Sequence, residues 1–201
     1  MAKIQALLIA AGESKRMGIA KQLLPWGTRT FIEHQIEILQ QANLSVAVVL
    51  GANAELIRKK MNSANIQIFE NKNWNEGMGT SIAYGVKEMM KKDVTAEGIL
   101  IALVDQPLIS SEHYKQLINA FESGKKQIIV SQSDNGLLTS PAILDKSYFE
   151  ELIQLTGDKG AKILFEKYKN EIVPIRSICN LQDIDTPTMY QKLLNDWNAK
   201  Q

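Results

Sequence analysis

The sequence predicts an α/β fold: a single-domain, Rossmann-like, three-layer α/β/α sandwich built on a mostly parallel sheet. Two observations support this prediction. Short apolar runs alternate along the chain with longer amphipathic segments, which is the order of strands and helices in a βαβ fold. Three of these runs, residues 4–10, 45–50 and 98–103, are almost continuously apolar, as expected for strands that helices cover on both faces. No repeat or linker interrupts the pattern, so residues 1–201 are expected to form one domain.

Each further element is predicted from the spacing of its apolar residues. Strands are expected at residues 66–69 and 127–131, and an edge or antiparallel strand at 137–144. Helices are expected at residues 30–42, 53–62, 80–92 and 111–123, and then near 146–155, 159–169 and 187–197. Ser110 or Ser111 is expected to cap the helix at 111–123, because a serine hydroxyl can accept a hydrogen bond from a free backbone N–H of the first turn.

The composition limits the classes of function. The chain has 201 residues, 45% of them hydrophobic and 22% charged, so it can bury a full core. Its net charge of +1 gives no reason to expect a nucleic-acid or membrane partner. Cys179 is the only cysteine, which excludes an internal disulfide and a metal site of several cysteines. The amino terminus lacks a signal-peptide pattern and no run approaches the roughly 18 apolar residues of a membrane span, so a cytoplasmic protein is expected.

The loop after the first strand has the composition of a phosphate site. Residues 10–21 are A-A-G-E-S-K-R-M-G-I-A-K, in which three small residues precede the cations Arg16 and Lys21. Ligands of such sheets bind at the carboxyl ends of the strands, and arginine and lysine suit phosphate oxygens. The spacing of Gly12 and Gly18 fits neither the dinucleotide fingerprint nor the P-loop. The residues alone leave two interpretations open, a phosphate-binding loop and a solvated polar turn.

Two Asp-x-Pro sequences supply carboxylates. Asp105, in D-Q-P, directly follows an apolar run, and Asp185 lies in D-I-D-T-P. A proline two residues later ends regular strand pairing, so each aspartate is expected at a strand end or a turn. Two carboxylates that converge from distant segments suit Mg²⁺, which takes oxygen ligands; a role in a turn or helix cap is the alternative. His34 and His113 lie in helix-like stretches and are interpreted as ordinary helix residues, so no zinc site is expected.

Two glycine-containing segments precede predicted helices. In G-M-G-T-S, residues 77–81, the paired glycines would let the backbone approach a ligand closely, and Thr80 or Ser81 would cap the helix. A flexible turn before a helix is the alternative. The segment G-D-K-G-A, residues 157–161, begins another helix, and its pattern alone is common at helix starts.

Taken together and in this order, the motifs resemble those of the molybdenum-cofactor cytidylyltransferases, a MobA-like group within the nucleotidyltransferases related to sugar-nucleotide pyrophosphorylases. The resemblance extends from residue 5 to about residue 195 and implies the nucleotide-diphospho-sugar transferase fold. It rests on residues 10–21, 77–81, 105–107 (D-Q-P), 157–161 and 183–187 (D-I-D-T-P). The first motif alone would indicate only the wider group, and the combination is much more specific.

The resemblance implies transfer of CMP from CTP to the phosphate of molybdopterin, with Mg²⁺ as cofactor and release of pyrophosphate. The nucleotide would be bound by Ala10, Ala11, Gly12, Arg16, Lys21, Gly77, Met78, Gly79, Thr80, Ser81 and Asp105. Of these, Arg16, Lys21 and Asp105 would be catalytic, and Asp105 with Asp185 would hold the metal. The acceptor would contact Pro141, Gly157, Asp158, Lys159 and Gly160. The opening Ala-Ala-Gly favours CTP, because relatives that transfer a guanylyl group usually have a second glycine there.

The sequence leaves the acceptor open. Relatives usually have Gly-x-Pro where this chain has Thr139, Ser140 and Pro141, and K-Q-L-L-P-W-G also resembles cytidylyltransferases that act on sugar or polyol phosphates. A nucleotidyltransferase for a sugar or polyol phosphate is therefore the first alternative. The others are a non-catalytic molybdenum-cofactor carrier and a Rossmann-like dehydrogenase, against which the broken fingerprint argues. A molybdenum hydroxylase or its maturation factor is the protein partner that the resemblance implies.

Overall fold

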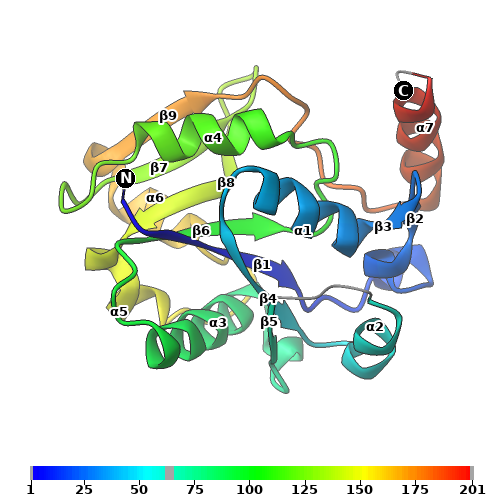
Figure 1. The fold of residues 1–201 in the computed structure, drawn as a ribbon, viewed down its shortest axis with the longest axis horizontal. Coiled ribbons are helices and arrows are strands. Elements are labelled where there is room, and N and C mark those ends of the chain that lie inside the picture. Colours follow the sequence, from blue (N-terminus) through cyan, green and yellow to red (C-terminus); the bar gives the residue numbers. More distant parts are fainter. Residues whose placement is uncertain (1, 62–65, 200–201) are drawn as a thin grey trace.

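The structure is a computed structural model that describes residues 2–61 and 66–199, and it is built on one seven-stranded sheet (Figure 1). The strands, in their order across the sheet, are β5 Gln67–Glu70, β4 Ser45–Leu50, β1 Ile4–Ala10, β6 Gly98–Leu103, β8 Leu138–Asp145, β7 Ile128–Gln132 and β9 Ile172–Arg176. Four of the six neighbouring pairs are parallel, and β8 runs antiparallel to both of its neighbours. The predicted mostly parallel α/β fold is confirmed.

Helices cover both faces of the sheet. The helices on one side are α1 Phe31–Gln41, α2 Ala54–Lys60, α4 Ser111–Ala120 and α7 Pro187–Asn198. Those on the other side are α3 Met78–Lys92, α5 Phe149–Leu152 and α6 Lys162–Lys167. Along β1, Ala6 and Leu8 belong to the core under α1, whereas Leu7 and Ile9 belong to the core over α3. This alternation is why the strand is apolar at nearly every position.

The strand predictions hold closely. Residues 4–10, 45–50 and 98–103 are β1, β4 and β6 with those bounds, and the strands expected at 66–69 and 127–131 each lie one residue later. β8 is antiparallel, as expected, but lies inside the sheet between β6 and β7, so an edge position for it is wrong. The outer strand β9 has no counterpart in the sequence prediction, because five residues interrupted by a proline carry little periodicity.

The helices agree best in the first half of the chain. The first four predicted helices are α1 to α4, although α3 begins two residues earlier than expected and α4 ends three residues earlier. Residue 62, at the end of the second predicted helix, lies outside the described residues. The segments 146–155 and 159–169 contain only the short helices α5 and α6, flanked by the 3₁₀ turns η4 Lys146–Tyr148 and η5 Lys169–Glu171. None of the described helices is long and apolar enough to cross a membrane.

Hydrogen-bonded caps fix the starts of two helices near the carboxyl ends of the strands. A short hairpin, β2 Pro25–Trp26 and β3 Arg29–Thr30, leads into α1. The Thr30 hydroxyl accepts from the Glu33 N–H while the Glu33 carboxylate accepts from the Thr30 N–H, so the two residues form a capping box. Ser110 caps α4 as predicted, accepting from the His113 N–H. These caps satisfy free N–H groups of the first turns and so fix where α1 and α4 begin.

Candidate functional site

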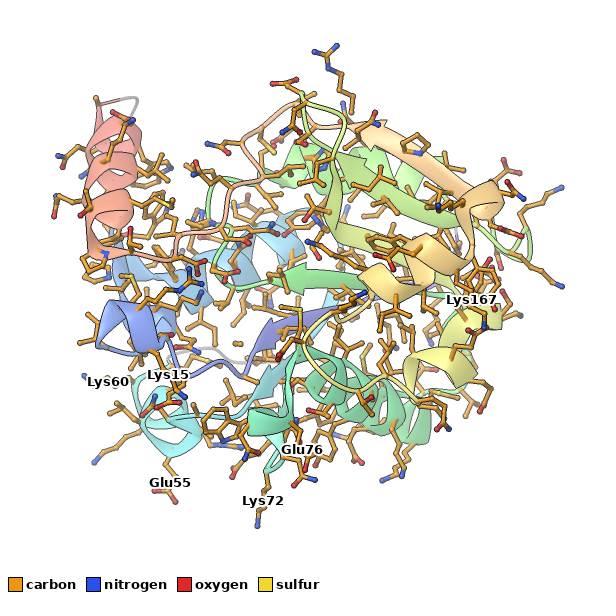
Figure 2. All side chains as sticks on the ribbon, turned by 180° about the vertical axis from the view of Figure 1, so that it is seen from behind. Lys15, Glu55, Lys60, Lys72, Glu76 and Lys167 are labelled. Atoms are coloured by element: carbon orange, nitrogen blue, oxygen red, sulfur yellow. The ribbon has the colours of Figure 1, made fainter. Side chains whose placement is uncertain are left out.

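A cleft of about 520 Å³ opens at the carboxyl end of β1. It lies between the loop after β1 and the loop that leads into α3. In Figure 2 the label Lys15 marks the first of these loops and the label Glu76 marks the second. The predicted site residues that line it are Ala11, Gly12, Arg16, Lys21, Gly77, Met78, Ser81, Asp158 and Asp185. Trp74 and Asn75 also line it, and no motif in the sequence marks them as site residues. The only feature that could have pointed to them is their position, four and three residues before the first residue of α3.

A buried glutamine holds the loop after β1 in shape. The Gln22 side chain is wholly buried and donates from Nε2 to the carbonyl oxygens of Ala10, at 2.8 Å, and Gly12, at 2.9 Å. The Lys21 backbone N–H donates to Ser14 Oγ at 3.2 Å. These bonds fold the loop back on the end of the strand, so that Lys21 reaches the cleft. Ala10 is buried under the loop and does not itself line the cleft.

Lys21 lies between two carboxylates. Its Nζ is 2.5 Å from Asp105 Oδ2 and 3.1 Å from Asp185 Oδ1, and Asp185 Oδ2 is 2.7 Å from an Arg16 guanidinium nitrogen. The Lys21 side chain is only 12% exposed, whereas that of Arg16 is 71% exposed. Burial acts to lower the pKa of Lys21, but Asp105 and then Asp185 outweigh it and raise that pKa above its ordinary value. Lys21 is therefore a permanent, mostly buried cation, and Arg16 an exposed one.

The fold joins the two aspartate segments directly. The Ile184 N–H donates to the Asp105 carbonyl oxygen at 2.8 Å, which places D-I-D-T-P beside the end of β6. A third carboxylate, Asp183, lies in the same segment. Part of this residue is exposed, yet desolvation of its carboxyl and then the negative charge of Asp105 and Asp185 raise the pKa of Asp183 to about 6. Asp183 belongs to the D-I-D-T-P motif, but the sequence indicates no role for it, because the main charge near its carboxyl, that of Asp105, comes from another segment of the fold.

Contact between two loops explains the glycines of G-M-G-T-S. A Cβ on Gly77 would lie 2.4 Å from the Gly157 carbonyl carbon, and a Cβ on Gly79 would lie 2.6 Å from the Thr156 carbonyl oxygen. The Gly79 N–H donates to the Gly157 oxygen at 2.7 Å. The start of α3 and the segment 156–158 therefore pack backbone against backbone, and any larger residue would separate them.

The two hydroxyl residues of this segment have different surroundings. α3 begins at Met78 with Gly77 as its N-cap, so a cap at Thr80 or Ser81 is wrong. The Thr80 hydroxyl donates to the Gly77 oxygen at 2.8 Å, and Thr80 does not line the cleft. Ser81 lines it although its residue is only 1% exposed, and its Oγ accepts from Asn71 Nδ2 at 3.0 Å.

A second cavity, of about 280 Å³, adjoins the cleft and shares Met78 and Asp158 with it. Its polar lining also comes from Thr139, Ser140, Lys159, Lys162 and Asp183. The rest of its lining is apolar, from α3, β6 and α6. Two ligands placed in the cleft and in this cavity would therefore meet near Met78 and Asp158.

The remaining residues that the resemblance assigns to the acceptor shape the backbone around this cavity. Gly157 and Gly160 have φ angles of 68° and 56°, in the left-handed region that favours glycine. Pro141 is buried and follows a cis peptide bond from Ser140, and its carbonyl oxygen accepts from Ser131 Oγ at 2.7 Å. None of Gly157, Gly160 and Pro141 lines either cavity.

The Asp105 and Asp185 pair has the chemistry of a magnesium site. Within residues 2–61 and 66–199, no three or more His, Cys, Asp and Glu side chains are grouped so as to hold a metal. Mg²⁺ keeps several waters and needs only one or two carboxylates. A cation, the Lys21 ammonium, already lies between these two carboxylates, and Asp105 Oδ1 is buried with no hydrogen-bond partner in the described part of the chain. The residues present therefore fit a divalent cation.

A comparison with known families matches most of the chain, up to residue 172 and short of the D-I-D-T-P segment. The family model described as the MobA-like NTP transferase domain matches residues 6–172. The chain belongs to the MobA-like NTP transferase family. The predicted resemblance is confirmed at this level.

Similar proteins carry the names of different activities. The molybdenum cofactor cytidylyltransferase of Escherichia coli is 27% identical, over 93% of this chain and 93% of its own length. The nicotine blue oxidoreductase of Paenarthrobacter nicotinovorans is 28% identical, over 95% of this chain and 96% of its own. Among solved structures, Rv0371c of Mycobacterium tuberculosis has a TM-score of 0.85 at 26% identity, covering 96% of this chain and 98% of that one. Membership of the MobA-like family therefore leaves the substrates to be argued from the site.

Proposed function

We propose that this MobA-like protein transfers CMP from CTP to the phosphate of a molybdopterin-type acceptor, with Mg²⁺ and with release of pyrophosphate. The observation that carries the proposal is the position of Lys21 between Asp105 and Asp185, in a cleft that adjoins a second cavity. The cleft offers cations for a triphosphate, and the adjoining cavity offers space for an acceptor. Asp185 lines the cleft, and Asp105 does not line it but contacts the same lysine, so the two carboxylates are available for a metal. Similarity to a cytidylyltransferase supports the choice of nucleotide and acceptor.

Arg16 and Lys21 are proposed to bind the triphosphate. Arginine can form two parallel hydrogen bonds to phosphate oxygens, and lysine adds a point charge. Both side chains contact Asp185 in the structure, so each must exchange a carboxylate for a phosphate when the nucleotide binds. Arg16 can do so without disturbing the core, because most of its side chain is exposed. Ala11 and Gly12, with the start of α3, are proposed to form the pocket for the base and ribose, and Ala10 is proposed to support them from below.

Asp105 and Asp185 are proposed to hold the metal. When bound, Mg²⁺ neutralises phosphate charge and so reduces the repulsion between two anionic substrates. The acceptor phosphate, with a second pKa near 6, is mostly dianionic at neutral pH and needs no general base. The protein's own contribution is then to place the two substrates in line and to supply positive charge. In the second cavity, Asp158 and Lys159 are proposed to face the acceptor, while Pro141, Gly157 and Gly160 are proposed to shape the backbone around that cavity without lining it.

Pyrophosphate release tests the proposal. The protein is incubated with Mg²⁺ and CTP, GTP, ATP or UTP, each with and without molybdenum cofactor, and release is expected only with CTP, cofactor and metal together. The variant Arg16→Ala should slow release. Its matched control is Arg176→Ala, which also removes an exposed arginine paired with a single aspartate, Asp134. Arg176 is the last residue of β9 and lines neither cavity. This control should release pyrophosphate at the rate of the unmodified protein.

Other outcomes would assign the site differently. Binding of CTP in a thermal-shift assay without release would redirect the search to sugar and polyol phosphates. Binding of the cofactor without any Mg²⁺-dependent release would favour a carrier. Oxidation of NADH or NADPH would refute the transferase and favour an activity like that of the oxidoreductase relative. A cytoplasmic location, and delivery of the product to a molybdenum hydroxylase or its maturation factor, belong to the same proposal.

A further inference from the structure

We infer that two buried glutamines, Gln35 and Gln106, are positioning residues that set the separation of the two metal-binding aspartates; the inference rests on the function proposed above. Both side chains are wholly buried at 0% exposure, and neither lines the cleft or the cavity beside it. Their hydrogen bonds connect α1 to the turn after β6, and that turn to the segment that carries Asp185.

The first link joins α1 to the turn that carries Asp105. Gln35 Nε2 donates to the Gln106 carbonyl oxygen at 2.6 Å and lies 3.4 Å from the Leu103 carbonyl oxygen. These two carbonyl groups flank Asp105 on either side in the chain. The amide of Gln35 therefore fixes the backbone from the last residue of β6 to the residue after the aspartate.

A neighbouring side chain of α1 strengthens the same link. His34 Nε2 is 3.0 Å from the Pro107 carbonyl oxygen, and because a carbonyl can only accept, this nitrogen carries the proton. Consecutive residues of α1 thus bond to consecutive carbonyl groups of D-Q-P. Since the capping box at Thr30 fixes the start of α1, the helix is a firm support for the turn.

The second link joins that turn to the other aspartate. Gln106 Nε2 donates to the Leu181 carbonyl oxygen at 2.9 Å, and Leu181 lies four residues before Asp185. The same two segments are also joined by the hydrogen bond from the Ile184 N–H to the Asp105 oxygen, and the Gln106 side chain interacts with the Asp183 carboxyl as well. One bond alone would let the segments pivot about it, whereas two bonds on different residues fix their relative orientation.

The glutamines carry an unfavourable feature that packing alone does not explain. The side-chain oxygens Oε1 of Gln35 and Gln106 are buried and have no hydrogen-bond partner among the described residues. An unpaired buried amide oxygen is destabilising, and methionine would fill nearly the same volume without it. Conflicts of this kind between local chemistry and burial are expected where function sets the residue. The alternative is that the amides only satisfy carbonyl groups beyond the end of β6.

A metal held by two carboxylates from separate segments is sensitive to their spacing. Groups that orient metal ligands without touching the metal typically contribute about 10- to 100-fold to metal affinity. Gln35→Met and Gln106→Met remove the donor and keep the size of the side chain. The matched control is Ile36→Val, the next residue of α1, which is buried in the core and bonds to neither aspartate segment.

The test measures Mn²⁺ binding to the full chain in the presence of CTP, by the electron paramagnetic resonance of free Mn²⁺, together with Tm. Both methionine variants should raise the Kd for Mn²⁺ by about 10-fold or more. The Mg²⁺ concentration for half-maximal pyrophosphate release should rise in parallel, with the KM for CTP at saturating Mg²⁺ unchanged. Ile36→Val should lower Tm and leave the Kd for Mn²⁺ unchanged. If Gln106→Met does not fold, Gln35→Met decides.

Two results would overturn the inference in distinguishable ways. If the unmodified protein binds Mn²⁺ and both methionine variants bind it equally well despite a lower Tm, the glutamines are structural only, and the proposed function stands. If the unmodified protein binds no Mn²⁺ with CTP present, the metal site itself fails, and the proposed function and the positioning role fail with it.

Discussion

Replacing Lys21 by methionine removes the cation between Asp105 and Asp185 and should destabilise the ligand-free protein. Removing one partner of a buried ion pair typically costs about 3–5 kcal/mol, because the other partner is left buried and unpaired. The carboxylate side chains here keep 18% and 30% exposure, so water compensates in part, and we expect a loss of about 2 kcal/mol in the free energy of unfolding at pH 7.5. For a chain of this size that corresponds to a fall in Tm of about 4–8 °C.

Urea denaturation at pH 7.5, with and without Mg²⁺, checks this effect. Mg²⁺ should stabilise Lys21→Met more than the unmodified protein, because it replaces the missing charge, while pyrophosphate release should fall by about 100- to 1,000-fold. Lys167→Met is the control: it removes an exposed lysine paired with Glu151 (Lys167 is labelled in Figure 2) and should change little. Equal stability of Lys21→Met and the unmodified protein at pH 7.5, with equal shifts by Mg²⁺, would refute the reasoning.

Three further predictions concern packing, pH and charge. Gly79→Ala should lower the free energy of unfolding, measured in urea, by about 1–2 kcal/mol, because the new Cβ would lie 2.6 Å from the Thr156 carbonyl oxygen. This overpacking outweighs the gain in helix propensity. The control Gly12→Ala should leave the free energy of unfolding unchanged, because no described residue other than its chain neighbours lies within 4 Å of its new Cβ. Burial lowers the pKa of His113 below its ordinary 6.5, so the neutral form favours the folded state. The free energy of unfolding should therefore be highest above pH 6.5 and fall as the pH drops below that value. His113→Gln should flatten this part of a plot of unfolding free energy against pH. Asp105→Asn should lower the pKa of Asp183 from about 6, measured by carboxyl ¹³C NMR, because Asp105 is the largest charge that raises it after desolvation.

The residues of the cleft could be predicted where a local signal coincides with a rule of topology. The apolar run of β1 ends at Ala10 and the cations follow within the same loop, so the rule that ligands bind at the carboxyl ends of strands is enough to place Arg16 and Lys21 together. Asp105 and Asp185 follow the same logic, because each precedes a proline that ends an extended segment. Their direct contact through one lysine needs the order of strands in the sheet, which the sequence does not contain.

The buried glutamines could not be predicted, because their surroundings are tertiary. In an amphipathic helix a glutamine is normally assigned to the solvent side, and nothing in the letters around Gln35 marks it as wholly buried. The raised pKa of Asp183 is hidden for the same reason, since it depends on charges that come from another segment. Polar residues at core positions are recognisable only once the carbonyl groups that they bond to have been placed.

The paired glycines show that a sequence signal can be clear while the group it serves stays unnamed. Glycine marks either a left-handed φ or a close approach of backbone, and the sequence does not say what approaches. At Gly77 and Gly79 the chain that approaches is the segment around Thr156 and Gly157, and a part for these glycines in nucleotide binding stays a prediction. This contact matters to the site all the same, because it brings Met78 and Asp158 to the boundary that the cleft and the second cavity share. A side chain that wedges the two loops apart would therefore alter both cavities at once, and the binding of nucleotide and acceptor should weaken together.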